Sequence, residues 1–349
     1  MIHKYLSPRF KFLFDLLHHN DLDLIIVSDR ELIRFFADFV SSNAWLAVFR
    51  KHIYLVTDPR YYGDVWATDQ RLVRKVVKNP SSLVFKQLER ANRKAGLDAS
   101  SLDSSIGRDA IQAGIMTVDI SQELENFISV SDKETQKRFS KAAAVTLKIE
   151  KQLEKLVQEG IREYSLRAGI SYLIHSAGCE EAFTPIVSFG ENTARIHTEP
   201  TQKKLKREMP VLIDFGVKYK GVSTDITRSF WFGDSPSEEY LNVRKTVKKA
   251  LKAAENSIKP GVETSVAFEA AMRVLTSNHA EVSECLPHAL GHGIGFRVHQ
   301  NPRMSAQSGQ QFKPGQIITL EPGIYIPEKF GVRIENDYII TENGVTKLI

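Results

Sequence analysis

Two aspartates interrupt apolar runs in the middle of the chain, at Asp214 and Asp225. The runs read as two short strands, Val211–Val217 and Val222–Phe232, which are joined by a tight turn. A hairpin that turns at Tyr219-Lys220 places the two aspartates opposite each other, with both side chains on one face of the ladder. Facing carboxylates repel, so the pair predicts a cation or a shared proton between them, with two unrelated solvent-facing aspartates as the alternative.

The end of the chain repeats this pattern with two glutamates. Glu321 interrupts the apolar run Gln316–Ile326, and Glu335 interrupts Val332–Ile340. A carboxylate in a buried strand needs an opposite charge or a metal ion beside it. Four carboxylates and at least one histidine on adjoining sheet faces form a ligand set for two divalent cations. The pattern therefore predicts a two-metal site.

Histidines gather shortly before these glutamates. His288, His292 and His299 fall within one short stretch that also holds three glycines. The glycines disfavour a helix, so this stretch is not the helical zinc motif, and they allow the backbone and a substrate to approach closely. A further histidine, His197, lies in a polar loop after the predicted strand Ile186–Phe189, where solvated or structural histidines are common.

The elements that must position these residues follow from hydrophobic periodicity. The second part of the chain is expected to hold four helices, over residues 131–159, 163–176, 235–257 and 265–278. Ser131 and Ser235 are the expected N-caps, because each is followed three residues later by a glutamate that can complete a capping box.

The first part of the chain alternates helices and strands and predicts an α/β domain. Helices are expected over 5–19, 31–39 and 59–77, and strands over 24–27, 44–49 and 53–57. No metal ligands or nucleophiles cluster here, so the expected roles are packing, shaping a cleft or oligomerisation. The predicted domains are 1–128 and 129–349, and the fold class is α/β (α+β).

Composition is that of an ordinary globular enzyme. The chain has 349 residues, 42% of them hydrophobic and 26% charged, and this length favours two domains. The net charge of +5 is small, and no basic run carries interleaved aromatics, so no nucleic-acid partner is expected. Cys179 and Cys285 are the only cysteines, which favours a reducing, cytoplasmic compartment and argues against a thiolate metal site. No membrane span or signal peptide is predicted.

Four blocks of the sequence resemble the Xaa-Pro peptidases of the pita-bread metallopeptidase group, aminopeptidase P and prolidase. In chain order they are DFG with TDITRSF, HALGHGIGFRVH, TLEPGIYI and VRIEND. The segment Ile53–Tyr61 is similar to the creatinase/prolidase-type N-terminal domain. The resemblance covers essentially the full length and implies a pita-bread catalytic domain at 129–349 after a smaller N-terminal domain at 1–128.

The resemblance also implies roles for individual residues. The implied ligands of a dinuclear centre are Asp214, Asp225, His292, Glu321 and Glu335, with Asp225 and Glu335 bridging the ions. The implied substrate-site and proton-transfer residues are His197, His288, His299 and Glu321, and the side chains expected beside the ligands are Arg333 and Tyr325. One departure is Gln300, which follows His299 where the family often has a glutamate.

The implied activity is hydrolysis of the Xaa-Pro bond at the N-terminus of peptides by a hydroxide that bridges the two ions. Mn²⁺ is the expected metal, with Co²⁺ or Zn²⁺ as alternatives. The implied partners are a peptide with proline at its second position and a second copy of the chain. The alternatives are an Xaa-Pro dipeptidase, a methionine aminopeptidase, a metal-free creatinase-like hydrolase and a non-catalytic binding module.

Overall fold

Contacts divide the chain into two compact units, Met1–Phe127 and Ile128–Ile349. The computed structural model describes residues 7–88, 94–99, 110, 112–277 and 286–349. Residues 5, 6 and 278 of the predicted helices, and Cys285, lie outside the described residues. Both units combine helices with sheets, as the predicted fold class requires, and that class is confirmed.

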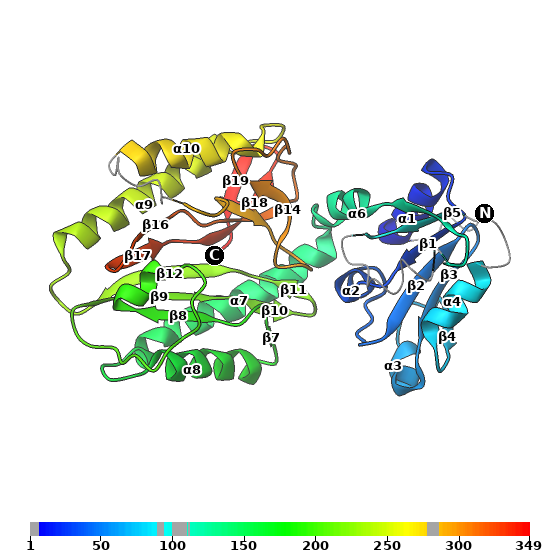
Figure 1. Cartoon of the computed structure of the whole chain (residues 1–349), viewed down its shortest axis with the longest axis horizontal. Coiled ribbons are helices and arrows are strands. Elements are labelled where there is room, and N and C mark those ends of the chain that lie inside the picture. The colour runs from blue at the N-terminus through cyan, green and yellow to red at the C-terminus, as the bar shows by residue number, and fades with distance from the viewer. Residues whose placement is uncertain (1–6, 89–93, 100–109, 111, 278–285) are drawn as a thin grey trace. The chain divides into compact units, whose positions relative to one another are not determined.

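The first unit is built on one mixed sheet of six strands in the order β4-β3-β2-β1-β5-β6 (Figure 1). Its elements are α1 (Pro8–His19), β1 (Leu24–Val27), α2 (Arg30–Ala37), β2 (Ala44–Phe49), β3 (Ile53–Thr57), η2 (Pro59–Tyr61), α3 (Tyr62–Val65), β4 (Val73–Val76), α4 (Pro80–Leu88), β5 (Lys94–Leu97), β6 (Met116–Asp119) and α6 (Ser121–Ile128). β1 lies between antiparallel β2 and parallel β5 and is buried throughout, as its continuous apolar run predicts.

One prediction for this unit is wrong. A single helix was expected over 59–77, but only Pro59–Tyr61 and Tyr62–Val65 are helical, and Val73–Val76 forms β4. β4 pairs in parallel with β3 at the edge of the sheet. The sequence Val-Arg-Lys-Val has a weak pattern of its own, so the pairing with a neighbouring strand decides its conformation.

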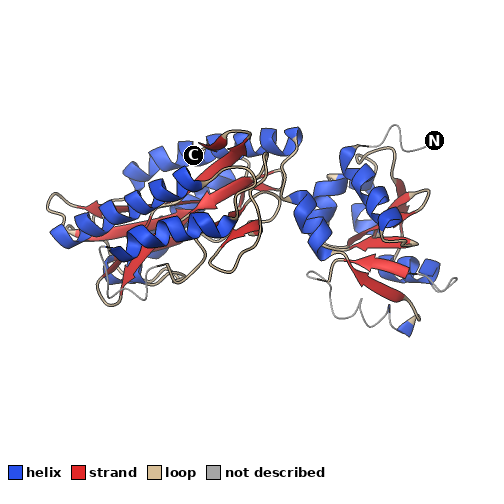
Figure 2. Ribbon diagram, turned by 90° about the horizontal axis from the view of Figure 1, so that it is seen from above, coloured by secondary structure: helices blue, strands red, loops and turns tan. Residues whose placement is uncertain are grey.

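In the second unit, strands lie between two pairs of helices, α7 with α8 and α9 with α10 (Figure 1, Figure 2). The helices are α7 (Lys133–Leu156), α8 (Glu163–Ser176), η3 (Gly190–Ala194), α9 (Glu238–Ser257) and α10 (Thr264–Ser277). The strands are β7 (Glu180–Glu181), β8 (Ile186–Phe189), β9 (Met209–Phe215), β10 (Val217–Tyr219), β11 (Val222–Ser223), β12 (Ile226–Phe232), β13 (Gly291–Gly293), β14 (Gln300–Met304), β15 (Ile317–Leu320), β16 (Gly323–Ile326), β17 (Phe330–Arg333), β18 (Asn336–Thr341) and β19 (Gly344–Lys347).

Two sheets of this unit carry the five predicted metal ligands. One has the order β12-β9-β8 and the other β14-β13-β15-β18-β19. The apolar faces of α9 and α10 form one core with the second sheet, in which Val247, Ala271 and Ile318 are fully buried. Within the described residues, no helix is long and apolar enough to cross a membrane.

The two predicted N-caps are each displaced along the chain. α7 is capped by Asp132, whose carboxylate accepts from the Thr135 N–H at 2.8 Å, and Ser131 is not the cap. α9 is capped by Ser237, whose hydroxyl accepts from the Tyr240 N–H at 3.2 Å, so the prediction of Ser235 as the N-cap is also wrong. Both observed caps are residue types that favour this position, and several such residues stand side by side here.

The central hairpin turns one residue later than predicted. Lys220 and Gly221 form the turn with φ of 48° and 87°, the backbone that a two-residue hairpin turn of matching twist requires. Because a turn displaced by one residue shifts the pairing by two, Asp214 lies opposite Thr227, and the prediction that it lies opposite Asp225 is wrong. A shift of two residues keeps the same face of the ladder.

Candidate metal centre

The five predicted ligands lie in or at the ends of strands from two sheets. Asp214 lies in β9, and Asp225 directly precedes β12. His292 lies in β13, Glu321 directly follows β15 and Glu335 directly precedes β18. All but Glu321, which is half-buried, are buried side chains. The sheets therefore bring residues from distant parts of the chain into one interior.

Glycines on both sides of His292 make its position possible. A Cβ at Gly291 would lie 2.1 Å from the carbonyl oxygen of Thr319, and one at Gly293 would lie 2.0 Å from that of Asn301. Only glycine therefore fits where β13 is held between β14 and β15. The short strand in turn fixes the direction of the His292 ring.

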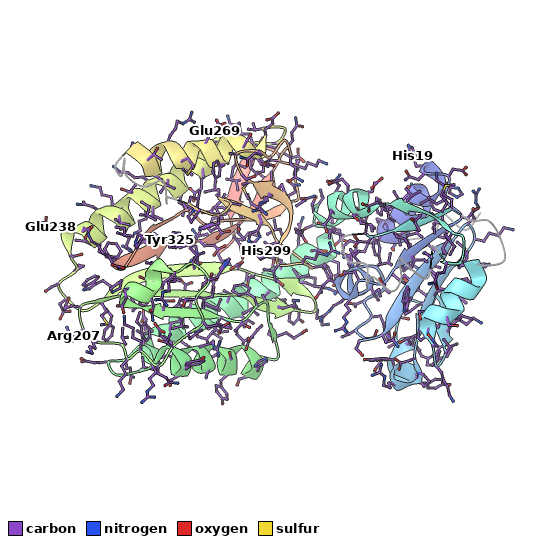
Figure 3. All side chains as sticks on the ribbon, in the orientation of Figure 1. His19, Arg207, Glu238, Glu269, His299 and Tyr325 are labelled. Atoms are coloured by element: carbon purple, nitrogen blue, oxygen red, sulfur yellow. The ribbon has the colours of Figure 1, made fainter. Side chains whose placement is uncertain are left out.

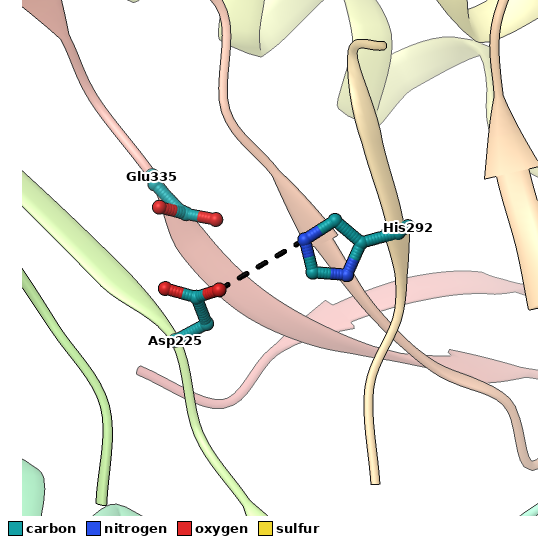
Figure 4. A group of neighbouring side chains, drawn as sticks. All are labelled: Asp225, His292 and Glu335. Atoms are coloured by element: carbon teal, nitrogen blue, oxygen red, sulfur yellow. Dashed lines mark ion pairs between the residues drawn. The ribbon is translucent and has the colours of Figure 1, made fainter. Parts of the chain in front are cut away.

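His292 faces two of the carboxylates. Its Nε2 lies 3.8 Å from Oδ2 of Asp225 and 3.7 Å from Oε1 of Glu321. Ligand atoms of Asp225, His292 and Glu335 all lie within 4.8 Å of one another (Figure 4). Nδ1 of His292 lies 3.0 Å from the carbonyl oxygen of Gly293, which fixes the ring proton on Nδ1 and leaves the Nε2 lone pair facing the carboxylates.

Burial shifts the pKa values of this group. Burial first, and then the charge of Glu335, raises the pKa of Asp225 and of Glu321 well above the ordinary range. Burial and the charge of Asp214 raise the pKa of Glu335 to about 7. Burial and the neighbouring His299 lower the pKa of His292 to about 3. Without cations the carboxylates therefore favour binding protons while the imidazole stays neutral, which is the state that divalent cations displace.

The residues fit a pair of divalent cations. Within the part of the chain that the structure describes, Oδ1 of Asp214 and Oδ1 of Asp225 are buried without a hydrogen-bond partner. Such oxygen atoms are costly to bury unless a cation contacts them. Four carboxylates and one neutral imidazole are the donor set of a hard, dinuclear site, and their four negative charges balance two divalent ions.

Arg333 connects Asp214, Tyr325 and, through Thr227, Glu335 by hydrogen bonds. Its Nη2 donates to Oδ2 of Asp214 at 2.5 Å and its Nη1 donates to the hydroxyl of Tyr325 at 3.0 Å. Its Nε donates to Oγ1 of Thr227 at 2.9 Å, and that hydroxyl lies 2.7 Å from Oε2 of Glu335. Arg333 therefore contacts Asp214 directly and Glu335 through Thr227, and the hydroxyl of Tyr325 lies against Arg333.

Both ring nitrogens of His288 have partners inside the protein. Its Nε2 lies 2.9 Å from the hydroxyl of Tyr325, and its Nδ1 lies 2.7 Å from the carbonyl oxygen of Ala289. Nδ1 is also 3.6 Å from Oε2 of Glu321. Burial, with the charge of Arg333, lowers the pKa of His288 to about 4. The ring is neutral and fully engaged, so it is poorly placed to donate to a substrate.

The other two predicted histidines lie closer to solvent. The exposed His299 packs its ring perpendicular to that of His292, with 4.5 Å between centroids. His299 and Tyr325 both lie in the middle of the second unit (Figure 3). The exposed His197 lies near both His288 and His299, since its charge contributes to lowering the pKa of each.

Gln300 is buried and turned toward the start of the second unit. Its Nε2 donates to the carbonyl oxygen of Ile128 at 3.3 Å. This amide supplies a proton that the carboxylate expected at this position would lack. Gln300, the residue that departs from the family pattern, therefore has a nearby acceptor, the carbonyl oxygen of Ile128.

Two further residues support the ligands and were not singled out from the sequence. Thr227 joins Arg333 to Glu335, as described above. Asp337 is fully buried, and its Oδ2 accepts from the backbone N–H of Asp225 at 3.0 Å. Asp337 could have been found as the second carboxylate in the apolar run Val332–Ile340. The sequence holds no signal that distinguishes Thr227 from other strand threonines.

Comparison with known proteins finds peptidases, both by family model and by sequence similarity. The model of metallopeptidase family M24 matches residues 137–342. An uncharacterized peptidase of Staphylococcus saprophyticus is 35% identical over 227 residues, which cover 65% of this chain and 64% of that protein. A putative Xaa-Pro aminopeptidase of Mycoplasma pneumoniae is 26% identical over 347 residues, covering 98% of this chain and 96% of that protein.

Among solved structures, prolidase from Pyrococcus furiosus matches with a TM-score of 0.89 at 26% identity, covering 96% of this chain and 98% of that one. These similarities confirm the resemblance and the pita-bread fold predicted from the sequence.

Proposed function

The chain belongs to metallopeptidase family M24, and from this membership we propose that it is an Xaa-Pro aminopeptidase, which removes the first residue of peptides that carry proline at the second position. An Xaa-Pro dipeptidase is the second candidate. A putative Xaa-Pro aminopeptidase and a prolidase match nearly the whole chain, which supports this pair of candidates. The observation that carries the proposal is the buried group of Asp225, His292 and Glu335.

The residues that would hold the two cations are Asp214, Asp225, His292, Glu321 and Glu335. When bound, the cations would supply an activated water molecule and polarise the carbonyl of the bond to be cleaved. Arg333 and Thr227 hold Asp214 and Glu335 in the orientation that this arrangement needs.

Two residues are proposed to handle protons. Glu321 takes the proton of the attacking water and delivers it to the proline nitrogen, which must be protonated to leave. Its side chain is 18% exposed against 8% for Asp225, so it is the more open to a substrate. His299 is proposed to donate to the developing oxyanion, because the ring nitrogens of His288 already have partners.

The test compares two substrates. The protein is stripped with a chelator, reconstituted with Mn²⁺ and offered an Xaa-Pro dipeptide and an Xaa-Pro-Yaa-Yaa tetrapeptide. Asp225→Asn, which keeps the shape of the side chain but removes a ligand charge, is the matched inactive control. Metal-dependent cleavage of the tetrapeptide supports the aminopeptidase, and cleavage of the dipeptide alone supports the dipeptidase.

Two outcomes would overturn the proposal. One is full metal content with no cleavage of either substrate. The other is wild-type turnover by a fully metal-loaded Asp225→Asn variant, which would remove Asp225 from the ligand set.

Three finer points belong to the same proposal. Mn²⁺ is favoured by the carboxylate-rich ligand set, and titration of the stripped protein with Mn²⁺, Co²⁺ and Zn²⁺ would test it. A homodimer rests on the family resemblance, and light scattering would test it. A cytoplasmic location is supported by the scarcity of cysteine.

A further inference from the structure

Glu163 is a fully buried carboxylate outside the metal centre, at the first position of α8. Its Oε1 accepts from the backbone N–H of Phe189 at 2.7 Å and from Nδ2 of Asn192 at 3.0 Å. Its Oε2 accepts from the backbone N–H of Thr201 at 2.7 Å and from the Thr201 hydroxyl at 2.6 Å. Each oxygen thus has two donors, and these hydrogen bonds compensate the buried carboxylate.

These donors are the two ends of one loop. Phe189 ends β8 and Asn192 lies in η3, at the start of the loop, while Thr201 closes it. Asn192 Nδ2 also lies 3.4 Å from Oγ1 of Thr201, directly across the loop. The segment between them, residues 190–200, carries His197 at an exposed position.

The start of this loop is also fixed to the strand that carries Arg333. In β17, the backbone N–H of Gly331 donates to Oγ1 of Thr193 at 2.9 Å. A Cβ at Gly331 would lie only 2.1 Å from the Thr193 carbonyl oxygen, so the two backbones are in direct contact. The end after His197 is held by backbone bonds as well, because the Tyr164 N–H donates to the carbonyl oxygen of Thr201 at 3.3 Å and the Glu163 N–H donates to that of Lys203 at 3.1 Å. The carboxylate of Glu163 contacts both ends at once.

We propose that Glu163 is a positioning residue that joins the two ends of loop 190–200 and thereby holds His197 at the substrate side of the metal centre. The part of this inference that concerns His197 rests on the proposed function. The part that concerns the loop rests on the hydrogen bonds of Glu163 alone.

The carboxylate cannot be replaced by its amide without loss. In Glu163→Gln, the NH₂ group must face either the Phe189 N–H or the Thr201 N–H, and neither backbone donor can turn away. One end of the loop is released in either orientation, because a buried donor left without an acceptor destabilises that contact. Thr201→Val is a milder second variant, since it removes the hydroxyl and keeps the backbone donor.

The loop provides its own reporter. Arg195 is exposed within it, so trypsin cleavage after Arg195, followed by mass spectrometry on the metal-loaded protein, measures how often the loop opens. The matched control is Glu191→Gln, the same substitution in the same loop, where the carboxylate of Glu191 is 56% exposed and pairs with Lys203. Such ion pairs contribute little. We expect Glu163→Gln to speed this cleavage by about tenfold or more, Thr201→Val to speed it less, and Glu191→Gln to leave it unchanged.

A double-mutant cycle tests the link to His197. Glu163→Gln is expected to lower kcat/KM for the peptide by about ten- to hundredfold, as misplacement of a substrate-contacting group does, without changing metal content. In a His197→Ala background the same substitution should have no further effect.

Equal losses in both backgrounds, or cleavage after Arg195 as slow as in the control, would overturn the inference. If the wild-type protein cleaves no Xaa-Pro peptide, the proposed function fails, and the trypsin measurement still decides the role of Glu163 in the loop.

Discussion

Arg333 and Asp214 form a buried ion pair, with 2.5 Å between Nη2 and Oδ2. The side chains are 2% and 10% exposed, so the guanidinium adds a permanent positive charge to the interior that holds the four carboxylates. With two divalent cations bound, the group as a whole would carry one positive charge. That balance favours the negative charge that develops on a carbonyl oxygen during hydrolysis.

Arg333→Lys is expected to weaken metal binding by about ten- to hundredfold. A lysine keeps the charge but offers no planar fork, so it cannot contact Asp214, Tyr325 and Thr227 together as Arg333 does. Competition with a chelating dye measures the affinity.

The control for this substitution is Arg207→Lys, which changes an exposed arginine paired with Asp234. It should leave metal affinity unchanged, since exposed pairs contribute little. Equal affinities for the two variants would contradict the role of Arg333.

Thr227→Val and Thr227→Ser should behave very differently. Arg333 Nε donates to Oγ1 of Thr227, so the single hydroxyl proton must go to Oε2 of Glu335. Valine has the same shape but removes both bonds, and we expect metal affinity to fall by about ten- to hundredfold. Serine keeps the hydroxyl, and its affinity should stay within a few-fold of wild type. Similar losses in both variants would mean that packing, not the hydroxyl, matters here.

The sequence singles out the residues of the candidate centre more readily than it predicts their geometry. Asp214, Asp225, Glu321 and Glu335 stand out because a carboxylate in an apolar strand is anomalous by itself. The predicted register of the hairpin is wrong because Lys220 takes a positive φ, which is uncommon for a lysine and which the sequence does not indicate. A local error of one residue in the turn becomes two in the pairing.

Supporting residues are harder to predict, because their roles depend on partners far away in the chain. Glu163 contacts residues up to Thr201, and Asp337 holds the backbone of Asp225 across more than a hundred residues. The local sequence does not show which distant groups these side chains contact. The same holds for β4, whose strand conformation comes from pairing with β3.

The stability of the metal-free protein should depend on Glu335 in a pH-dependent way. Its pKa is about 7 in the folded protein against an ordinary value of 4.5, because of burial and the charge of Asp214. A raised carboxyl pKa contributes stability below its unfolded value, and this is lost as pH rises through the folded value. Glu335→Gln lacks that loss, so its free energy of unfolding relative to wild type should increase from pH 5 to 8, by up to about 3 kcal/mol.

Urea unfolding of the chelator-treated proteins at several pH values measures this difference. His292, with its pKa of about 3, works in the opposite direction and loses stability as pH falls below its ordinary value, but it is present in both proteins and cancels. With metal added, the order should reverse, because the variant lacks a ligand charge. A difference that does not change with pH would contradict the raised pKa of Glu335.

The tautomer of His288 follows from the number of protons its neighbours can give. Arg333 has only protons to offer, so the Tyr325 oxygen accepts from Nη1 and its own proton goes to Nε2 of His288. The His288 proton is therefore on Nδ1, where it meets the carbonyl oxygen of Ala289. With a pKa of about 4, caused by burial and the charge of Arg333, the ring should stay neutral between about pH 5 and 8.

Nitrogen NMR of imidazole-labelled protein, loaded with diamagnetic Zn²⁺, tests this arrangement directly. We expect one ring with a protonated Nδ1 and an unprotonated Nε2, and with shifts that do not move across that pH range. Tyr325→Phe removes the proton that Nε2 accepts, so the same ring should become a mixture of tautomers. A wild-type His288 that carries its proton on Nε2 would reverse the direction of the bond to Tyr325, and would return this histidine to the candidates for donating to the substrate.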